Sequence, residues 1–296
     1  MKILVCIKQI PAPAETGDIP GRTSGGNGAG GREEYRPGGS WFADDRCYHL
    51  NPYDEHALEE ALRLREQFPE TTIDALSVGP DRCRRVLRRA LELGADRAIQ
   101  LRAEPGIKRG RDIKKLPDDS EPPSPGAPPA LTPYETSAAI AAYLADQPAY
   151  DLIFTGVMAE DGMAGQTGQL LAELLGIPCA TAVVSERLPS PRGPVYVERE
   201  EDGGDRTAYE IDLPALLTIQ SGINRPRYPA LSHVLRARTQ EIITVDAAPL
   251  LPAPRERTVH IYRRESSADC RFLTGTLPEQ ARQFLDFCRK RGFLSS

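Results

Sequence analysis

Short apolar runs alternate with helical patterns along the first 190 residues of this chain. The apolar runs at residues 3–7, 72–78, 97–101 and 152–155 are short enough to be buried strands. Between them, apolar side chains recur at helical spacing over residues 52–65, 82–93 and 136–144. Alternation of this kind is typical of a parallel sheet with helices on its faces, so we predict an α/β fold.

After residue 190 the pattern changes to that of an antiparallel extension. Residues 195–200 and 207–211 flank a glycine-containing turn and predict a hairpin, and residues 215–219 predict a further buried strand. A short helix with Ser232 as its cap and a strand at 241–245 complete this part. We therefore expect one α/β domain over residues 1–246, followed by a C-terminal arm over 247–296 with an amphipathic helix at 278–290.

Two stretches interrupt the alternation. Residues 16–40 are rich in glycine, and residues 103–133 are rich in proline and charge. Neither stretch has enough apolar side chains to offset the entropy of ordering its backbone. We expect both to be mobile surface insertions.

Composition narrows the class of protein. A net charge of −5 argues against a general nucleic-acid-binding protein, and no apolar stretch reaches the length of a membrane span. The apolar run at the start of the chain is too short for the core of a secretory signal. The cysteines are scattered without metal-ligand spacing, and Cys6 and Cys179 lie in apolar contexts. We expect free thiols, a cytoplasmic location and no metal site.

The segment that carries most chemical information is the glycine-rich turn at residues 157–170. Gly162, Gly165 and Gly168 lie where a predicted strand leads into a helix, and backbone N–H groups at such a point can hold an anion. A bare connection without ligand is the alternative from this segment alone. No GxGxxG or GxxxxGK[ST] motif is present, so neither a dinucleotide fingerprint nor a triphosphate-hydrolysing loop is indicated.

The ends of neighbouring predicted strands favour the ligand-binding alternative. In a parallel sheet, ligands bind at the carboxyl ends of the strands. Cys6 and Val78 end two of them, and Asn51 caps the start of a helix nearby. We predict a mononucleotide site there, with Asp161, Gln166 and Thr167 as polar anchors.

Candidate catalytic groups are few. His49, His56, His233 and His260 lie far apart, with no triad or nucleophile-elbow spacing. We therefore assign no catalytic residue, and the pattern favours a binding or carrier subunit over an enzyme with its own chemistry.

Several ordered blocks of the sequence resemble the beta subunit of electron transfer flavoprotein. The opening strand and loop at residues 5–11, the Asn51-Pro-Tyr-Asp helix start, residues 76–80 and 93–97, and the glycine-rich turn are similar to that family. The most specific blocks are Val197-Glu-Arg-Glu with Gly203-Gly204, and Arg225-Pro-Arg-Tyr-Pro-Ala-Leu. The resemblance implies an adenine nucleotide alpha hydrolase-like fold that forms a heterodimer with an alpha subunit.

The resemblance also implies a function and its residues. The alpha subunit would hold the redox-active FAD, and this chain a structural AMP. Electrons would pass from flavin-dependent dehydrogenases of the acyl-CoA type to a quinone reductase or a similar acceptor. Docking of the dehydrogenase would use the loop after Tyr228, with Leu231 as its apolar anchor, while Glu200 would face the alpha subunit. The implied nucleotide site comprises Cys6, Asn51, Pro52, Tyr53, Asp54, Val78, Ala159, Asp161, Gly162, Met163, Ala164, Gly165, Gln166, Thr167, Gly168 and Gln169.

Departures from the family pattern leave alternatives open. Electron-bifurcating relatives carry a second FAD in place of AMP and an Asp-Gly-Asp-Thr run in the turn. Here Asp161-Gly162 is followed by Met163-Ala164, which matches neither that run nor the acid-rich version of the AMP-binding members. We favour AMP, with a bifurcating subunit that binds FAD and NADH as the alternative. The run that follows the recognition helix in the family is lysine-rich, whereas here residues 236–242 are less basic, which leaves the identity of the partner dehydrogenase open. A stand-alone nucleotide-binding protein of the stress-protein type is the alternative from another class.

Overall fold

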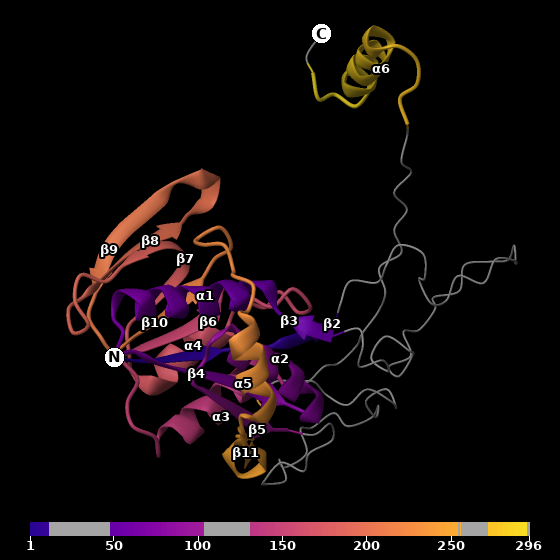
Figure 1. Ribbon diagram of the computed structural model, residues 1–296. Helices are drawn as coiled ribbons and strands as arrows, with labels where there is room; N and C mark the ends of the chain where they lie inside the picture. The colour runs from indigo at the N-terminus through magenta and orange to yellow at the C-terminus, as the bar shows by residue number, and fades with distance from the viewer. Residues whose placement is uncertain (12–47, 104–130, 254, 256–271, 295–296) are drawn as a thin grey trace, which may run out of the picture. The chain divides into compact units, whose positions relative to one another are not determined.

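The computed structural model of this protein describes residues 1–11, 48–103, 131–253, 255 and 272–294 (Figure 1). These residues belong to two compact units. The larger unit contains the described residues up to 255, and the smaller one contains residues 272–294. Most of the two predicted insertions, and His260, lie outside the described residues.

The larger unit is built on a nine-stranded sheet in the order β11-β5-β4-β1-β6-β10-β7-β8-β9. The pairs from β11 to β7 are parallel, and β8 and β9 add an antiparallel hairpin at one edge. This confirms the predicted α/β fold with a hairpin extension. The strands are β1 (Lys2–Cys6), β4 (Thr72–Gly79), β5 (Arg97–Arg102), β6 (Leu152–Gly156), β7 (Cys179–Arg187), β8 (Val195–Glu200), β9 (Arg206–Ile211), β10 (Ala215–Ile219) and β11 (Ile242–Asp246).

Helices cover both faces of this sheet, because alternate strand residues point to opposite sides. Ile3 and Val5 of β1 pack in one core with α1 (Pro52–Gln67) and α2 (Arg84–Leu93). Leu4 and Cys6 pack in a second core with α3 (Pro133–Leu144) and α4 (Thr167–Leu175). The helix α5 (Leu231–Thr239) packs against α2. The continuous apolar character of the parallel strands follows from this burial on both faces.

Local details differ from the sequence-based expectation in four places. The third helix begins at Pro133 rather than 136, because Thr132 and Glu135 form a capping box. The helix α5 begins at Leu231 with Ala230 as its N-cap, so Ser232 is not a cap. The strand β7 follows no clear period-two pattern and was not predicted. Nor was the small antiparallel pair of β2 (Gln9–Pro11) and β3 (Tyr48–Leu50).

A polar cluster ties the strands together at their amino ends. Asp74 of β4 is buried and accepts hydrogen bonds from Arg97 (Nε–Oδ1 2.9 Å, Nη2–Oδ2 2.5 Å) and from the Tyr150 hydroxyl (2.7 Å). Burial alone would raise the pKa of Asp74, but the hydrogen bonds from Arg97 and Tyr150 lower it below its usual value. Asp74 is therefore held as a carboxylate inside the fold.

The smaller unit contains α6 (Leu277–Lys290), whose start is fixed by a capping box between Thr276 and Glu279. This confirms the helix predicted at 278–290. Its apolar face remains largely open within the described residues; the side chain of Phe284, for example, is 55% exposed. None of the helices in the described ranges is both long and apolar enough to cross a lipid bilayer.

Candidate functional site

The predicted nucleotide-site residues lie at the carboxyl edge of the parallel sheet. The chain runs from β1 outward to β4 and β5, and then returns to place β6 on the other side of β1. This reversal makes the carboxyl ends of β1 and β6 a topological switch point, where open α/β sheets bind ligands. Cys6 ends β1, Gly156 ends β6, and Val78 lies near the end of β4, next to β1.

Asp54, in the first turn of α1, joins these strand ends. Its Oδ2 accepts the backbone N–H of Lys8 (2.7 Å), and its Oδ1 accepts that of Gly156 (2.9 Å). Burial raises the pKa of Asp54 to about 7, although both N–H donors act to lower it. A Cβ atom on Gly156 would lie 2.5 Å from Asp54 Oδ1, so glycine is required for this contact.

The side chain of Asn51 does not cap α1, as the sequence had suggested, but binds the backbone of the glycine-rich turn. The residue occupies the N-cap position of α1, as predicted, but its side chain makes no capping hydrogen bond. Instead Nδ2 donates to the Met158 carbonyl (2.9 Å), and Oδ1 accepts the N–H of Glu160 (3.3 Å). Asn51 therefore fixes the beginning of the glycine-rich turn against α1.

Lys8 is a site residue that the sequence reasoning missed. Its Nζ lies 2.7 Å from Oδ1 of Asp161, so the segment after β1 is joined to the glycine-rich turn by an ion pair. The signal was present in the sequence, since Lys8 closely follows the first strand. A single lysine after a strand is too common to identify a site by itself.

The glycine-rich turn is shaped by two residues in the left-handed region, Met163 (φ 49°) and Gly165 (φ 59°). The N–H groups of Gly162 and Met163 both point back to the Ala159 carbonyl (3.3 and 2.8 Å). The turn therefore closes on itself before α4 begins, and Met163 stands outward with 68% of its surface exposed.

The start of α4 is close to the sheet and offers free donors. A Cβ atom on Gly168 would lie 2.6 Å from Thr218 Cγ2 and 2.8 Å from Thr155 Oγ1. Within the described part of the chain, the N–H groups of Thr167 and Gln169 have no acceptor. Such unpaired donors at a helix N-terminus suit an anion. The neighbouring Ala164 and Gln166 are exposed, and Pro52 and Tyr53 are half-buried at the start of α1.

No reactive group is apparent at this edge. Burial raises the pKa of the Cys6 thiol to about 12, which makes a thiolate nucleophile unfavourable there. His56 is occupied by a hydrogen bond to Asn224 (2.9 Å). Among the described residues, no three acidic, histidine or cysteine side chains converge so as to hold a metal ion. Within the described ranges, this edge presents backbone N–H donors at the start of α4 and the buried carboxyl of Asp54, an arrangement that suits an anionic ligand.

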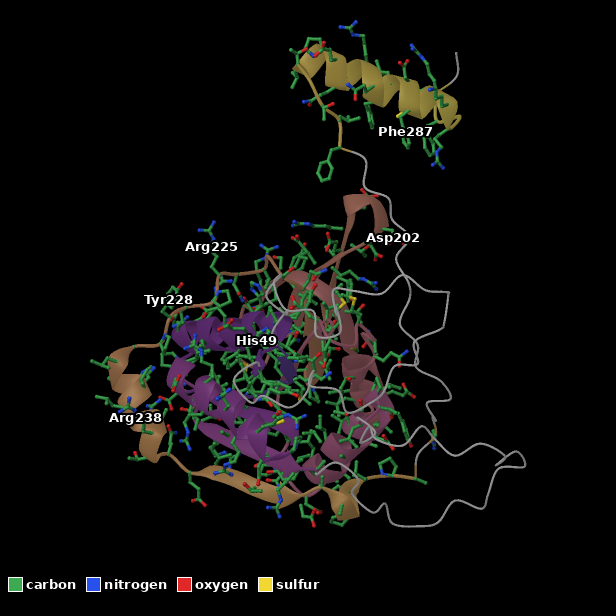
Figure 2. The ribbon with its side chains drawn as sticks, turned by 90° about the vertical axis from the view of Figure 1, so that its right-hand side faces the viewer. His49, Asp202, Arg225, Tyr228, Arg238 and Phe287 are labelled. Atoms are coloured by element: carbon green, nitrogen blue, oxygen red, sulfur yellow. The ribbon has the colours of Figure 1, made fainter. Side chains whose placement is uncertain are left out.

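The predicted docking residues lie on a separate surface. Tyr228 is 93% exposed (Figure 2). Leu231 is 74% exposed, so it is not a core residue. Leu235, one helical turn after Leu231, is 53% exposed and extends the same apolar row; the sequence reasoning missed it. Glu200, at the end of β8, accepts a hydrogen bond from Gln220 (3.1 Å).

Comparison with known proteins places the chain among electron transfer proteins. The family model described as "Electron transfer flavoprotein domain" matches residues 40–105 and 125–250. The chain is similar to proteins named electron transfer flavoprotein subunit beta from several organisms. The Bacillus subtilis protein is 32% identical over 81% of this chain and 85% of its own length. The mouse protein is 35% identical (73% and 75%), and that of Methylophilus methylotrophus is 30% identical (84% and 80%). The chain therefore belongs to the electron transfer flavoprotein family, together with its beta subunits.

Proposed function

We propose that this chain is the beta subunit of a heterodimeric electron transfer flavoprotein. It pairs with an alpha subunit that holds most of the FAD, and the heterodimer carries electrons from flavin-dependent dehydrogenases, of the acyl-CoA type, to a quinone reductase or a similar acceptor. The observation that carries this proposal is the junction at the switch point, where Asp54, Asn51 and Lys8 join β1, β6, α1 and the glycine-rich turn. Family membership favours this carrier role over a stand-alone nucleotide-binding protein.

The residues at the junction fit an adenosine monophosphate. The N–H groups of Thr167 and Gln169, which have no acceptor among the residues that the structure describes, would hold its phosphate at the start of α4. Lys8 pairs with Asp161 at 2.7 Å, so it fixes the glycine-rich turn to the segment after β1. AMP has no redox chemistry, so its contribution when bound would be structural. The chain's own residues bind and orient it.

The count of bound nucleotides tests this assignment against the bifurcating alternative. We expect the purified heterodimer, when denatured, to release one FAD and one AMP. Met163 matches neither the aspartate of the bifurcating pattern nor the acid-rich turn of the AMP-binding members, so the count decides between the two. Chromatography of the released nucleotides gives the ratio directly. Two FAD and no AMP would instead assign the second flavin to this chain.

We propose that Leu231 anchors the partner dehydrogenase. A side chain that is this exposed contributes little to folding, but it can fill an apolar pocket on a partner. Leu231→Ala is expected to raise the KM for the heterodimer about tenfold in a dehydrogenase-coupled assay, since truncation of an interface anchor costs about 1–2 kcal/mol. The nucleotide content and the melting temperature should stay unchanged. Loss of either would mean that Leu231 supports the fold instead.

Two further surfaces belong to the proposed heterodimer. Glu200 would face the alpha subunit, and the arm at residues 247–296, with the open apolar face of α6, would contact it as well. Cys6, Cys179 and Cys288 form no disulfide among the described residues, which suits the reducing cytoplasm.

A further inference from the structure

The segment that presents Tyr228 is held to the domain almost without apolar burial. We call residues 221–230 the docking loop. It connects β10 to α5, and none of its residues is buried. Ile223 is partly buried against the core. A depression of about 720 Å³ lies between the loop and α1, and Glu59, Arg63 and Glu66 line it on the helix side. Hydrophobic packing therefore does not explain how the loop keeps its shape.

Arg227 provides the main attachment of the docking loop. Its Nε donates to Glu59 Oε2 (2.9 Å), its Nη2 to Glu59 Oε1 (2.8 Å), and its backbone N–H to Glu59 Oε2 (3.1 Å). Its Nη1 reaches Glu66 Oε1 at 2.6 Å. Glu59 is buried in α1, whereas the side chain of Arg227 is 35% exposed, so only the carboxylate end of the pair is shielded from water. Two-point pairing of a guanidinium with a carboxylate is among the stronger polar contacts in proteins.

A second attachment lies three residues earlier. Asn224 donates from Nδ2 to the His56 carbonyl (2.9 Å) and to Glu60 Oε2 (2.7 Å), and its Oδ1 lies 2.9 Å from His56 Nδ1. Both attachments therefore end on α1. Tyr228 follows Arg227 directly in the sequence, and Figure 2 shows the side chains of Arg225 and Tyr228 directed away from the domain.

We infer that Arg227 is a positioning residue for partner docking, which fixes the loop to Glu59 and Glu66 of α1 so that Tyr228 and Leu231 are presented in one orientation. The inference rests on the proposed docking role of this surface. Arg227 would order the loop in the free protein, so the entropy cost of ordering it would not have to be met when the dehydrogenase binds. Lysine would replace it poorly, because a single ammonium group cannot pair with both carboxylates in this planar geometry.

The test separates positioning from simple stability. In the heterodimer, Arg227→Met is expected to raise the KM in the dehydrogenase-coupled assay about five- to tenfold and to leave kcat unchanged. Arg227→Lys should fall between this variant and the wild type. Glu66→Gln removes only the exposed half of the pairing and should give a smaller rise without a folding defect. Arg97→Met is the matched control. It breaks a comparable pair with Asp74 at the amino ends of β4 and β5, and it should lower the stability without a change in KM.

Two readouts show whether Arg227 acts through the loop. In the double variant Arg227→Met/Leu231→Ala, the fold-increase in KM should be well below the product of the fold-increases of the two single variants. Once the loop has moved, Leu231 contributes less to docking, so its removal has a smaller effect. Hydrogen exchange of residues 221–231 should rise in Arg227→Met and stay unchanged in Arg97→Met.

Each outcome leads to a definite conclusion. Unchanged exchange in Arg227→Met overturns the inference, whatever the partner is. Raised exchange with an unchanged KM overturns it too, if Leu231→Ala still weakens docking. If exchange rises but neither substitution affects docking, the proposed docking surface is wrong and the attachment of the loop by Arg227 stands.

Discussion

Gly168→Ala is expected to leave the purified heterodimer with less than about a tenth of its adenine nucleotide. The added Cβ would lie 2.6 Å from Thr218 Cγ2 and 2.8 Å from Thr155 Oγ1, and both neighbours are β-branched side chains with little freedom to move. The first turn of α4 must therefore move away from the sheet. Overpacking of this kind costs about 1–3 kcal/mol. Because the displaced turn carries the N–H donors of Thr167 and Gln169, we expect the substitution to weaken nucleotide binding more than it weakens the fold.

The same turn offers a matched control for this substitution. A Cβ atom on Gly162 would meet nothing within 4 Å, so Gly162→Ala should keep the nucleotide. Chromatography of the released nucleotide, with circular dichroism to verify folding, compares the two variants. Equal loss in both would show that the turn contacts the nucleotide at Gly162, and that the packing of α4 is not the decisive factor.

Asp74→Asn is expected to lower the free energy of unfolding by about 2–3 kcal/mol at neutral pH, which corresponds to a fall in Tm of roughly 5–10 °C. The substitution removes the charge that pairs with Arg97 and weakens the hydrogen bond from Tyr150. The cost is less than that of a fully buried pair, because the side chain of Arg97 is 47% exposed and can be hydrated again. Thermal or urea unfolding of the heterodimer, compared between the wild type and Asp74→Asn, measures this loss of stability.

The pH dependence of the same difference identifies its cause. The pKa of Asp74 is lower in the folded chain than in the unfolded one, so its stabilising contribution is complete above the unfolded value of about 4 and is lost as the pH falls further. The wild type and Asp74→Asn should therefore converge in stability below about pH 4. Asp96→Asn is the control: Asp96 pairs with Arg65 at 3.3 Å and is half-exposed, and an asparagine oxygen can still accept the N–H of Ile73 that Asp96 accepts at 2.8 Å. The change should therefore cost under about 1 kcal/mol. A constant difference at all pH values would assign the effect to packing.

The fold was largely predictable because its parallel strands are buried on both faces. Runs such as residues 152–155 and 215–219 are nearly all apolar, and the helix after Asn51 has its proline and acids where a helix start needs them. β7 was harder to find, since it pairs with a parallel strand on one side and an antiparallel one on the other, and its exposure follows no simple period.

The candidate site was predictable only in part, because its position depends on strand order. Residues at strand ends could be named, but only the sheet order shows that β6 lies beside β1. The role of Asn51 depends on the path of residues 158–160, which no pattern in the sequence specifies. Arg227 could not be distinguished from other exposed arginines, because its partners on α1 lie more than 160 residues earlier.

The shared use of α1 has a mechanical consequence for this protein. Asn51 and Asp54 lie at one end of this helix, and Glu66, which holds Arg227, lies near the other. At 1.5 Å per residue the two ends are roughly 22 Å apart, so a tilt of about 5° at the nucleotide end would displace the far end by about 2 Å. A small rotation of α1 at the proposed nucleotide site is therefore transmitted, with a larger displacement, to the residues that hold Arg227. The geometries of the proposed nucleotide site and of the proposed docking loop are therefore not independent. A substitution that changes the direction of α1 at one of them changes the position of the other.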